Sequence, residues 1–581
     1  MLLFNIFSLI IIFISFSLSI VGYGYHFKKY LTNENNFEIG ESGIFGFVFL
    51  YLVAVTIHFF FSLNQVTTIT ILIIGIFLSI KIHTKIQEYF NKNLFIHLLI
   101  VFLSLILAAT NNLHDDVYLY QLPYVNYLQS EKIIFGLSSL NDFAAYSHGL
   151  YDIMSLFKVP IFKNQTIFLI PVIFVMFFLF ILNDNLKVNK NYLRVFTYII
   201  LFLFLFKFTR SKQFGTDVPV ICLLFLIQIY ILNYIKSENK NYFFKSVIIF
   251  IFAVFLKIYA IFSVFYLLFF LIKFKENILI FFKNRNLVFF ICFICLITFS
   301  KNVIHTGCLM YPVTSTCLEK ENANWSVGKK AIELRKVSLE AATKGIRIYI
   351  RNQGHKEIIT PEEYLDKFKY TYHLNVIKDP DFERFLVLVS IFLILCLTNV
   401  VNFFIKKKDY LIEEKFDKKI LYLSFFPFLA WIIYIPHIRY GGYSYIAFFL
   451  YLLFLKLNLF KYLTKKNLNI LLILGLFFIF SKNYLRIKDE YYLKKFSINN
   501  YPLPEYKIFN FSSKKINNLE LNISNHWQLC GEIPFPCLVK TNFDSINQIK
   551  SVFGYYFINS DEQKVIKHMK KEIYKIHYEM N

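Results

Sequence analysis

The chain has 581 residues, of which 57% are hydrophobic, 20% are aromatic and only 17% are charged. A soluble chain of this length would be expected to carry about a quarter charged residues and to divide into several domains. The composition therefore excludes a soluble enzyme, a disordered chain and a coiled coil. The net charge of +24 raises the question of nucleic acid, but basic residues beside membrane spans also meet anionic headgroups. We expect membrane lipids, and no nucleic acid, as partners.

Apolar runs of about 15–22 residues recur from Leu2 to Tyr484, and this length crosses a bilayer as a helix. The run from Phe244 to Ile272 is too long for one span and short for two, so we predict two short helices that meet near Lys257. The predicted fold class is an all-α polytopic integral membrane protein with about 13–14 transmembrane helices. The other expected spans are 2–21, 44–62, 66–83, 94–110, 166–183, 192–207, 217–235, 286–302, 384–405, 419–436, 444–460 and 468–482.

Basic residues in the short loops indicate the orientation, because positive charge beside a span stays cytoplasmic. Lys28 and Lys406 are two of the many that fall on one side. This places both termini outside, together with the loops 111–165, 208–216, 303–383 and 437–443. Residues 1–21 lack a basic n-region, so we expect a retained first span rather than a removed signal peptide. The predicted location is the bacterial inner membrane, as a multi-pass protein of the cell envelope.

Eight cysteines support this orientation independently of charge. Four lie in the expected outer segments as two close pairs, Cys308 with Cys317 and Cys530 with Cys537. An oxidising compartment allows each pair to form a disulfide. Neither spacing is CxxC and no His cluster stands nearby, so we predict disulfides and no metal site at these cysteines.

The chain is expected to divide into a membrane domain, residues 1–485 with the extracytoplasmic loops 111–165 and 303–383, and a soluble extracytoplasmic domain, residues 486–581. Loop 111–165 is predicted to be partly helical, and loop 303–383 contains a helix-like stretch from Val327 to Tyr349. The C-terminal domain is predicted to be small and mixed α/β. Its expected elements are strands near 506–511 and 535–541 and a basic helix at 561–577.

The most informative stretch follows the span 94–110 and contains two adjacent carboxylates, Asp115 and Asp116. Neighbouring carboxylates at a membrane face repel each other, which keeps one proton on the pair. One of them could accept a proton from a hydroxyl nucleophile while the other binds a cation or orients the acceptor. Acidic residues are also typical of helix N-termini, where they cap the first turn. The spacing leaves both interpretations open.

Three further positions carry charge near the expected membrane surface. Lys257 lies within a hydrophobic segment, where a charge usually faces a partner or a cavity. Asp217 begins an outer-side span, and we interpret it as a helix N-cap. Arg439, in the turn from Pro436 to Gly442, could bind a lipid phosphate by paired hydrogen bonds or extend to the headgroups. Between Gly136 and Asp152, polar and aromatic residues gather as in sites for polyhydroxy ligands, although loop packing would select a similar mixture.

The order of these motifs resembles the GT-C superfamily of polytopic glycosyltransferases, which use polyprenyl-phosphate sugars. The resemblance rests on an outer loop that opens with an acidic pair, a TDxP motif on a later span and a PxxRYG turn near the end. More narrowly, the order of HDDxYxYQLP, GLSSLN, TGCLMYP and PHIRYGG, with Trp527, Cys530, Pro536 and Cys537 in the tail, is similar to a group of bacterial membrane proteins. Three spans precede the one that leads into the acidic loop, whereas the simplest superfamily members reach that loop after their first span.

The resemblance implies a membrane glycosyltransferase that moves a sugar from a polyprenyl-phosphate donor to a glycan or lipid acceptor on the extracytoplasmic face by one inverting displacement. It implies Asp115 or Asp116 as the catalytic base and Arg439 as a contact to the donor phosphate. No cofactor is required, although a divalent cation at Asp115 and Asp116 is an open alternative. The candidate substrate-binding residues are His114, Tyr118, Asn141, Asp142, His148, Lys257, Arg439 and Tyr440.

Other classes of protein share parts of this pattern. A polymerase or ligase of lipid-linked glycans would rely on Arg and His of the large outer loop. A transporter or flippase of lipid-linked substrates would show internal repeats and Gly- or Pro-interrupted spans, and the sequence has no evident repeat and only 18 Gly. An inactive scaffold would use its outer tail to bind partners. The candidates for the ligase alternative are His305, Arg335, Arg347, Arg351 and His355.

Overall fold

The structure is a computed structural model in which most of the chain is described. The described residues are 2–110, 116–141, 146, 149–187, 191–212, 215–273, 281–353, 359–405, 418–457, 465–492, 501–503, 506, 509–516, 519–526 and 529–578.

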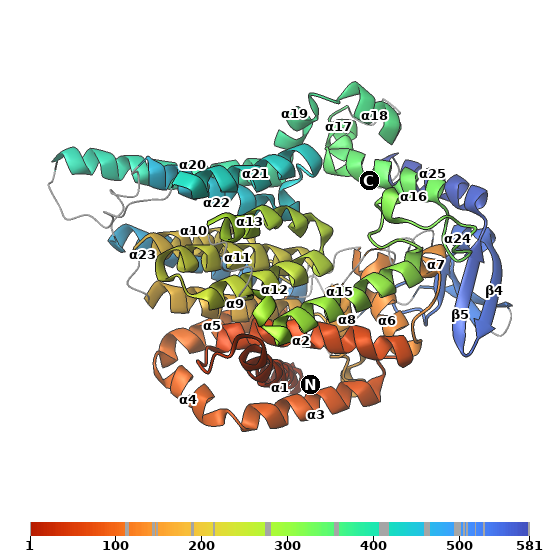
Figure 1. Ribbon diagram of the computed structural model, residues 1–581, viewed down its shortest axis with the longest axis horizontal. Helices are drawn as coiled ribbons and strands as arrows, with labels where there is room; N and C mark the ends of the chain where they lie inside the picture. Colours follow the sequence, from red (N-terminus) through yellow and green to blue (C-terminus); the bar gives the residue numbers. More distant parts are fainter. Residues whose placement is uncertain are drawn as a thin grey trace.

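Long apolar helices form the body of the molecule, with two small sheets and the short helices of the loops at one end (Figure 1). This confirms the predicted helical fold with a small α/β part near the C-terminus. The helices of the body are α1 (Leu2–Thr32), α2 (Ile39–Phe60), α3 (Gln65–Ile80), α4 (His83–Asn91), α5 (Leu94–Ala109), α9 (Leu169–Lys187), α10 (Asn191–Lys207), α11 (Asp217–Ser237), α12 (Lys240–Leu256), α13 (Val264–Lys273), α15 (Arg285–Thr306), α20 (Pro380–Ile405), α21 (Lys418–Tyr434), α22 (Tyr443–Lys456) and α23 (Lys465–Tyr492).

Seven helices are long and apolar enough to cross a membrane, by length and composition, within the described residues. The pair α3 and α4 is bent by 67° and adds an eighth candidate if it is one broken span. Several apolar helices of this length indicate a multi-pass membrane protein. The larger number of 13–14 spans includes shorter helices and stays a prediction. The seven are Leu2–Thr32, Ile39–Phe60, Asn164–Lys187, Asp217–Ile235, Arg285–Thr306, Ile438–Lys456 and Leu468–Glu490.

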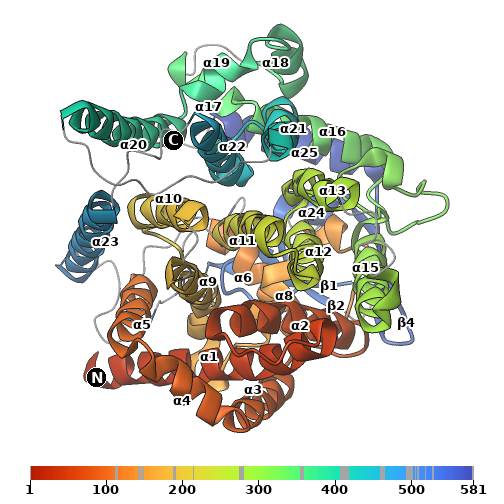
Figure 2. The same ribbon diagram turned by 60° about the vertical axis from the view of Figure 1, so that its left-hand side comes forward.

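Helices α9 and α11 lie at the centre of the bundle (Figure 2), and 94% of the apolar window of each is buried. At the periphery, α1 and α2 approach each other through small residues. A side chain added at Gly24 would overlap the carbonyl oxygen of Ser42 and the backbone of Gly46. Small residues that let two helix backbones meet are typical of membrane helix packing, where van der Waals contact replaces the hydrophobic effect.

The predicted break near Lys257 is confirmed. Helix α12 ends at Leu256, Lys257 is extended with φ −156° and ψ 126°, and the chain continues as η4 (Ile258–Ser263) into α13. A Lys within an apolar run favours such a break because its charge needs a polar partner.

The loops 111–165 and 303–383 are both partly helical, as predicted. The expected helix from Val327 to Tyr349 is divided into α16 and α17, because Gly345 has φ +95°, a left-handed conformation that ends a helix. The elements are η1 (Val117–Gln121), α6 (Leu122–Ser130), α7 (Leu137–Leu140), α8 (Gly149–Ser155) and η3 (Pro160–Thr166) in the first loop, and η5 (Thr314–Thr316), α16 (Lys329–Thr343), α17 (Ile346–Asn352), α18 (Pro361–Lys367) and α19 (Tyr372–Ile377) in the second.

A buried ion pair holds the first loop on the helix bundle. Nζ of Lys301 in α15 lies 2.5 Å from Oδ1 of Asp152 in α8, and the two side chains are 5% and 1% exposed. Beside this pair, Oη of Tyr127 is 3.1 Å from Nε2 of His305, and Nε2 of His58 is 3.1 Å from the carbonyl oxygen of Glu131. These polar contacts link α2, α6, α8 and α15 beneath the loop.

The C-terminal part contains two sheets and two helices. Strands β1 (Phe511–Ile516) and β2 (Leu519–Ser524) are antiparallel, with Phe511 opposite Ser524, and β3 (Cys537–Val539) runs parallel to β2. Strands β4 (Ile546–Val552) and β5 (Tyr555–Ser560) form a hairpin, accompanied by α24 (Lys540–Ser545) and α25 (Glu562–Tyr578). The predicted strand at 506–511 is wrong, since Tyr506 packs its ring on Phe168 and the first strand starts only at Phe511.

Both predicted disulfides are confirmed, Cys308 with Cys317 and Cys530 with Cys537. Disulfides in the loop 303–383 and in the C-terminal part indicate an oxidising compartment.

The C-terminal strands pack directly on the first loop. The backbone N–H of Phe135 donates to the carbonyl of Tyr556, and that of Ile558 donates to the carbonyl of Phe135. The rings of Phe135 and Phe557 stack at 4.1 Å. The loops and the C-terminal part therefore form a joint layer, while the domain boundary at residue 486 stays a prediction.

Candidate functional site

The candidate site is a row of four charged side chains, Asp116, Arg439, Asp217 and Lys257, which we call the ion-pair cluster. Nε of Arg439 donates to Oδ2 of Asp217. Nη2 of Arg439 lies 3.9 Å from Oδ2 of Asp116. Nζ of Lys257 lies 3.9 Å from Oδ1 of Asp217. The charges alternate in sign along the row, and the two carboxylates and two cations give the cluster no net charge.

The four side chains differ in their exposure. Asp217 is only 5% exposed, whereas Asp116 is 25%, Lys257 is 23% and Arg439 is 29% exposed. Asp217 is therefore the buried link that orients the two cations. The other three side chains are each about a quarter exposed.

Two members of the cluster lie at breaks in helical structure, and a third adjoins a π-helical turn. Asp116 directly precedes the π-helical turn η1, Lys257 separates α12 from η4, and Arg439 lies in η6 (Ile438–Gly442), an irregular turn before α22. Irregular backbone between membrane helices is tolerated where it is buried in protein or lines a polar site. Gly441 makes the turn possible, because its φ is +82° and a Cβ there would lie 2.8 Å from the ring of Tyr445.

Aromatic residues surround the charges. The rings of Tyr440 and Tyr259 are 5.7 Å apart, and the ring of Tyr440 is 5.0 Å from that of His437. On the other side, Tyr120 in η1 contacts the ring of Tyr151 at 6.2 Å. Burial raises the pKa of Tyr120, and the carboxylates of Asp116 and Asp217 raise it further. Tyr120 thus stays a protonated phenol, which can donate a hydrogen bond beside the carboxylates.

Of the predicted site residues, the structure brings together Asp116, Lys257, Arg439 and Tyr440. Two others lie along the same segment as Asp116 but make different contacts. The ring of Tyr118 packs on Phe509 at 5.8 Å, and the amide of Asn141 donates to the carbonyl of Leu119 at 3.5 Å. The remaining predicted residues lie outside the described residues, namely His114, Asp115, Asp142 and His148.

One interpretation from the sequence requires correction. Asp217 is not the N-cap of α11, since Thr216 occupies that position and the Asp217 side chain instead pairs with Arg439. In the sequence, only the TDxP motif indicated that Asp217 could have a functional role. The Arg439 side chain turns toward the carboxylates of Asp116 and Asp217.

Among the described residues, no three His, Cys, Asp or Glu side chains come together as ligands of an ion. A divalent cation at Asp115 and Asp116 remains a prediction, because Asp115 lies outside those residues.

Comparison with known families matches residues 1–447 to the family described as "Domain of unknown function (DUF8201)". This match covers more than half of the chain, which therefore belongs to the DUF8201 family. The matched region includes all four residues of the ion-pair cluster. No curated protein and no solved structure matches the chain.

Proposed function

We propose that this member of the DUF8201 family is a membrane glycosyltransferase that moves a sugar from a polyprenyl-phosphate donor to an acceptor on the extracytoplasmic face. The observation that supports the proposal is the approach of Arg439 to within 3.9 Å of Asp116. The carboxylate of Asp116 and the guanidinium of Arg439 thus lie close together although they are far apart in the sequence. A catalytic base and a contact to the donor phosphate need this proximity.

The proposed reaction assigns a role to each charged group. Asp116 accepts the proton of the acceptor hydroxyl, whose oxygen attacks the anomeric carbon. The bond between that carbon and the phosphate oxygen breaks, and the lipid phosphate leaves with the electron pair. Arg439 and Lys257 stabilise the departing phosphate by charge and hydrogen bonds.

The ion pairs within the cluster are compatible with this reaction. The 3.9 Å between Arg439 and Asp116 exceeds a hydrogen bond, so a donor phosphate could take over this side of the guanidinium. Asp116 would then act as the base toward the acceptor hydroxyl, while Asp217 keeps Arg439 in position from its buried side. Substrate binding would thereby assemble the base and the phosphate contact together.

The proposal includes a location and a topology. We place the protein in the bacterial inner membrane with 13–14 spans, its outer loops and C-terminal part on the extracytoplasmic side. The two disulfides support this side, because disulfides persist in oxidising compartments.

The test is a transfer assay with the purified protein in lipid nanodiscs and a panel of labelled polyprenyl-phosphate sugars. Asp116→Asn should lower the rate at least about a hundredfold, as expected for loss of a general base. Glu333→Gln is the matched control, since Glu333 is a carboxylate of the predicted outer loop 303–383 that is 46% exposed and pairs with the neighbouring Lys336. Full activity of Asp116→Asn, with loss of activity in Arg347→Ala, would refute the proposal and favour the ligase alternative.

A further inference from the structure

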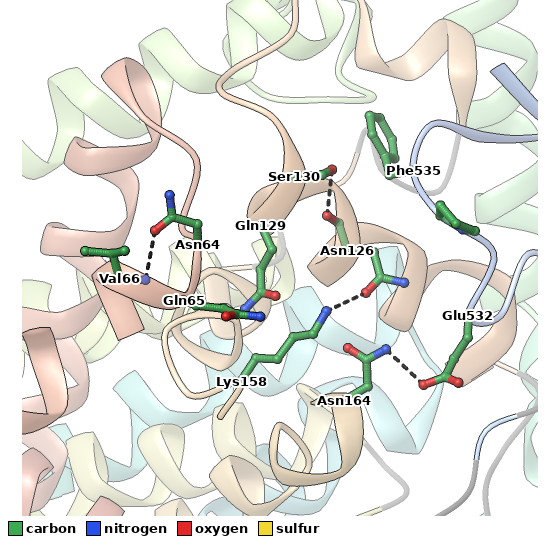
Figure 3. Close-up of a pocket in the computed structure, with 11 residues that line it drawn as sticks. Asn64, Gln65, Val66, Asn126, Gln129, Ser130, Lys158, Asn164, Glu532 and Phe535 are labelled. Carbon is green, nitrogen blue, oxygen red and sulfur yellow. Dashed lines mark hydrogen bonds between the residues drawn. The ribbon is translucent and has the colours of Figure 1, made fainter. Parts of the chain in front are cut away.

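A second candidate site lies away from the ion-pair cluster, in a pocket of about 720 Å³ between the start of α3, helix α6, turn η3 and the disulfide loop 530–537 (Figure 3). This volume is within the range of small-ligand sites. The pocket draws its walls from four segments that are far apart in the sequence, and the C-terminal part completes it.

Carboxamides dominate the lining. Five of the eleven lining residues are Asn or Gln, and only two are charged. A carboxamide presents two donors and an acceptor in one plane, which matches hydroxyl groups that both donate and accept. The five carboxamides are Asn64, Gln65, Asn126, Gln129 and Asn164.

The two charged side chains in the lining are hydrogen-bonded to carboxamides. Nζ of Lys158 donates to Oδ1 of Asn126 at 3.2 Å, and Nδ2 of Asn164 donates to Oε1 of Glu532 at 3.0 Å (Figure 3). One positive and one negative charge leave the lining without net charge, which favours a neutral polar ligand over an anion. Asn164 is 6% exposed, and its Oδ1 has no hydrogen-bond partner among the described residues. A buried acceptor without a partner is costly, so a ligand hydroxyl would be favoured there.

The walls of the pocket are fixed before any ligand binds. The amide of Gln129 donates to the carbonyl of Ser155 at 2.8 Å, and the backbone N–H of Leu63 donates to the carbonyl of Leu128. Phe535 stands in the disulfide loop with its ring 4.9 Å from that of Tyr127. A preformed pocket with one aromatic ring and several amides provides both kinds of contact that a sugar uses, its apolar face and its hydroxyls.

Exposed apolar residues flank the pocket. Phe61 is 69% exposed, Val66 is 71% exposed and Ile161 is 84% exposed, and each lies within a few residues of the lining. In a membrane protein such a rim is typical of the lipid interface. A ligand carried on a lipid could therefore reach the pocket from the bilayer surface.

We infer that this pocket binds a carbohydrate chain, and that the Cys530–Cys537 loop is present to form its outer wall. Helix α6 continues directly from η1, and the loop fixes itself to η1 through the backbone N–H groups of Cys530 and Gly531, which donate to the carbonyl of Tyr118. Ten residues separate Asp116 from Asn126, a span of about 15 Å at helical rise. The bound chain would lie beside the ion-pair cluster, but its binding does not depend on the proposed transfer reaction.

The test is retention of the labelled full-length protein, in detergent, on an array of bacterial oligosaccharides. Gln65→Ala should weaken retention about threefold to tenfold, the effect of one hydrogen bond. Gln65 is exposed, and its side chain makes no hydrogen bond within the described part of the chain, so this variant should fold. Phe535→Ala should weaken retention further by removing the ring. Asn322→Ala is the matched control, an exposed carboxamide of the second outer loop, and should bind as the unchanged protein does.

Three results would overturn the inference. The first is that no glycan on the array retains the protein. The second is that Gln65→Ala and Phe535→Ala both leave retention unchanged. The third is that vesicles of phosphatidylethanolamine and phosphatidylglycerol displace the glycan, which would identify a pocket for lipid headgroups. To identify the source of the carbohydrate, the affinity of the protein for one retained glycan is compared between its free form and its form linked to polyprenyl diphosphate. Tighter binding of the lipid-borne form indicates a lipid-linked chain, and equal binding indicates a free polysaccharide; either supports the inference.

Discussion

Replacing Lys301 with methionine should destabilise the protein strongly at neutral pH and only weakly in mild acid. Lys301 lies 2.5 Å from Asp152, and both side chains are almost fully buried. The second carboxylate oxygen of Asp152 makes no hydrogen bond within the described residues. Without Lys301 the carboxylate would be buried alone, so Asp152 would take up a proton instead.

The magnitude follows from that proton. An Asp with its ordinary pKa of about 3.9 requires about 4 kcal/mol to be protonated at pH 7 and about 1.5 kcal/mol at pH 5. Burial already raises the pKa of Asp152, and Lys301 opposes this rise, so the substitution moves the folded-state pKa higher still. The folded pKa then exceeds the unfolded one, and stability is lost as the pH rises through the folded value.

Asp152→Asn should show the opposite pH dependence. It leaves Lys301 without a carboxylate, and releasing the proton of a Lys with an ordinary pKa of about 10.4 requires about 4.5 kcal/mol at pH 7 but only about 2 kcal/mol at pH 9. The double substitution removes both charges and should lie within about 1.5 kcal/mol of the unchanged protein.

The assay is the free energy of unfolding from SDS titration in mixed micelles, measured by tryptophan fluorescence at pH 5, 7 and 9 and compared with the unchanged protein at each pH. Lys336→Met is the control. It breaks a 3.0 Å pair with Glu333 in which both side chains are 46% exposed, and it should change stability by less than about 1 kcal/mol. The reasoning fails if the two single variants share one pH trend, or if the double variant is as unstable as either.

Four other outcomes follow from the geometry. Asp217→Asn should lower transfer in the nanodisc assay at least about tenfold by releasing Arg439, whose position it fixes. Gly24→Leu should prevent a monodisperse peak in size-exclusion chromatography, because the side chain would overlap α2. Burial lowers the pKa of Lys158 to about 8, so stability should rise between about pH 8 and 10.5 as the folded state deprotonates first, and Lys158→Met should abolish that rise. Replacing both Cys530 and Cys537 with serine should increase tryptic cleavage of the C-terminal part and weaken glycan retention.

The sequence alone was enough to predict features whose cause is local. Helix length and apolarity are set by the thickness of the bilayer, and both disulfides join cysteines fewer than ten residues apart. The break at Lys257 also followed from a charge inside an apolar run. Strand β1 could not be predicted from local sequence, because almost all of its residues are exposed and show no alternation of apolar and polar residues.

The role of Asp217 shows where local patterns end. An acidic residue in the first turn of a helix is equally typical of a cap and of an ion pair, and the sequence favoured the cap. Its actual partner, Arg439, is 222 positions away. The carboxamide pocket had no sequence signal at all, since its lining runs from Asn64 to Phe535 without a motif.

The sequence thus determined that the chain forms long apolar helices and polar, disulfide-bonded segments between and after them, because these depend on residues close together along the chain. Only the tertiary structure decided which charges neutralise one another and which amides share a pocket. Burying a charge or an amide is unfavourable until a partner satisfies it, and those partners are brought within reach only when distant helices pack.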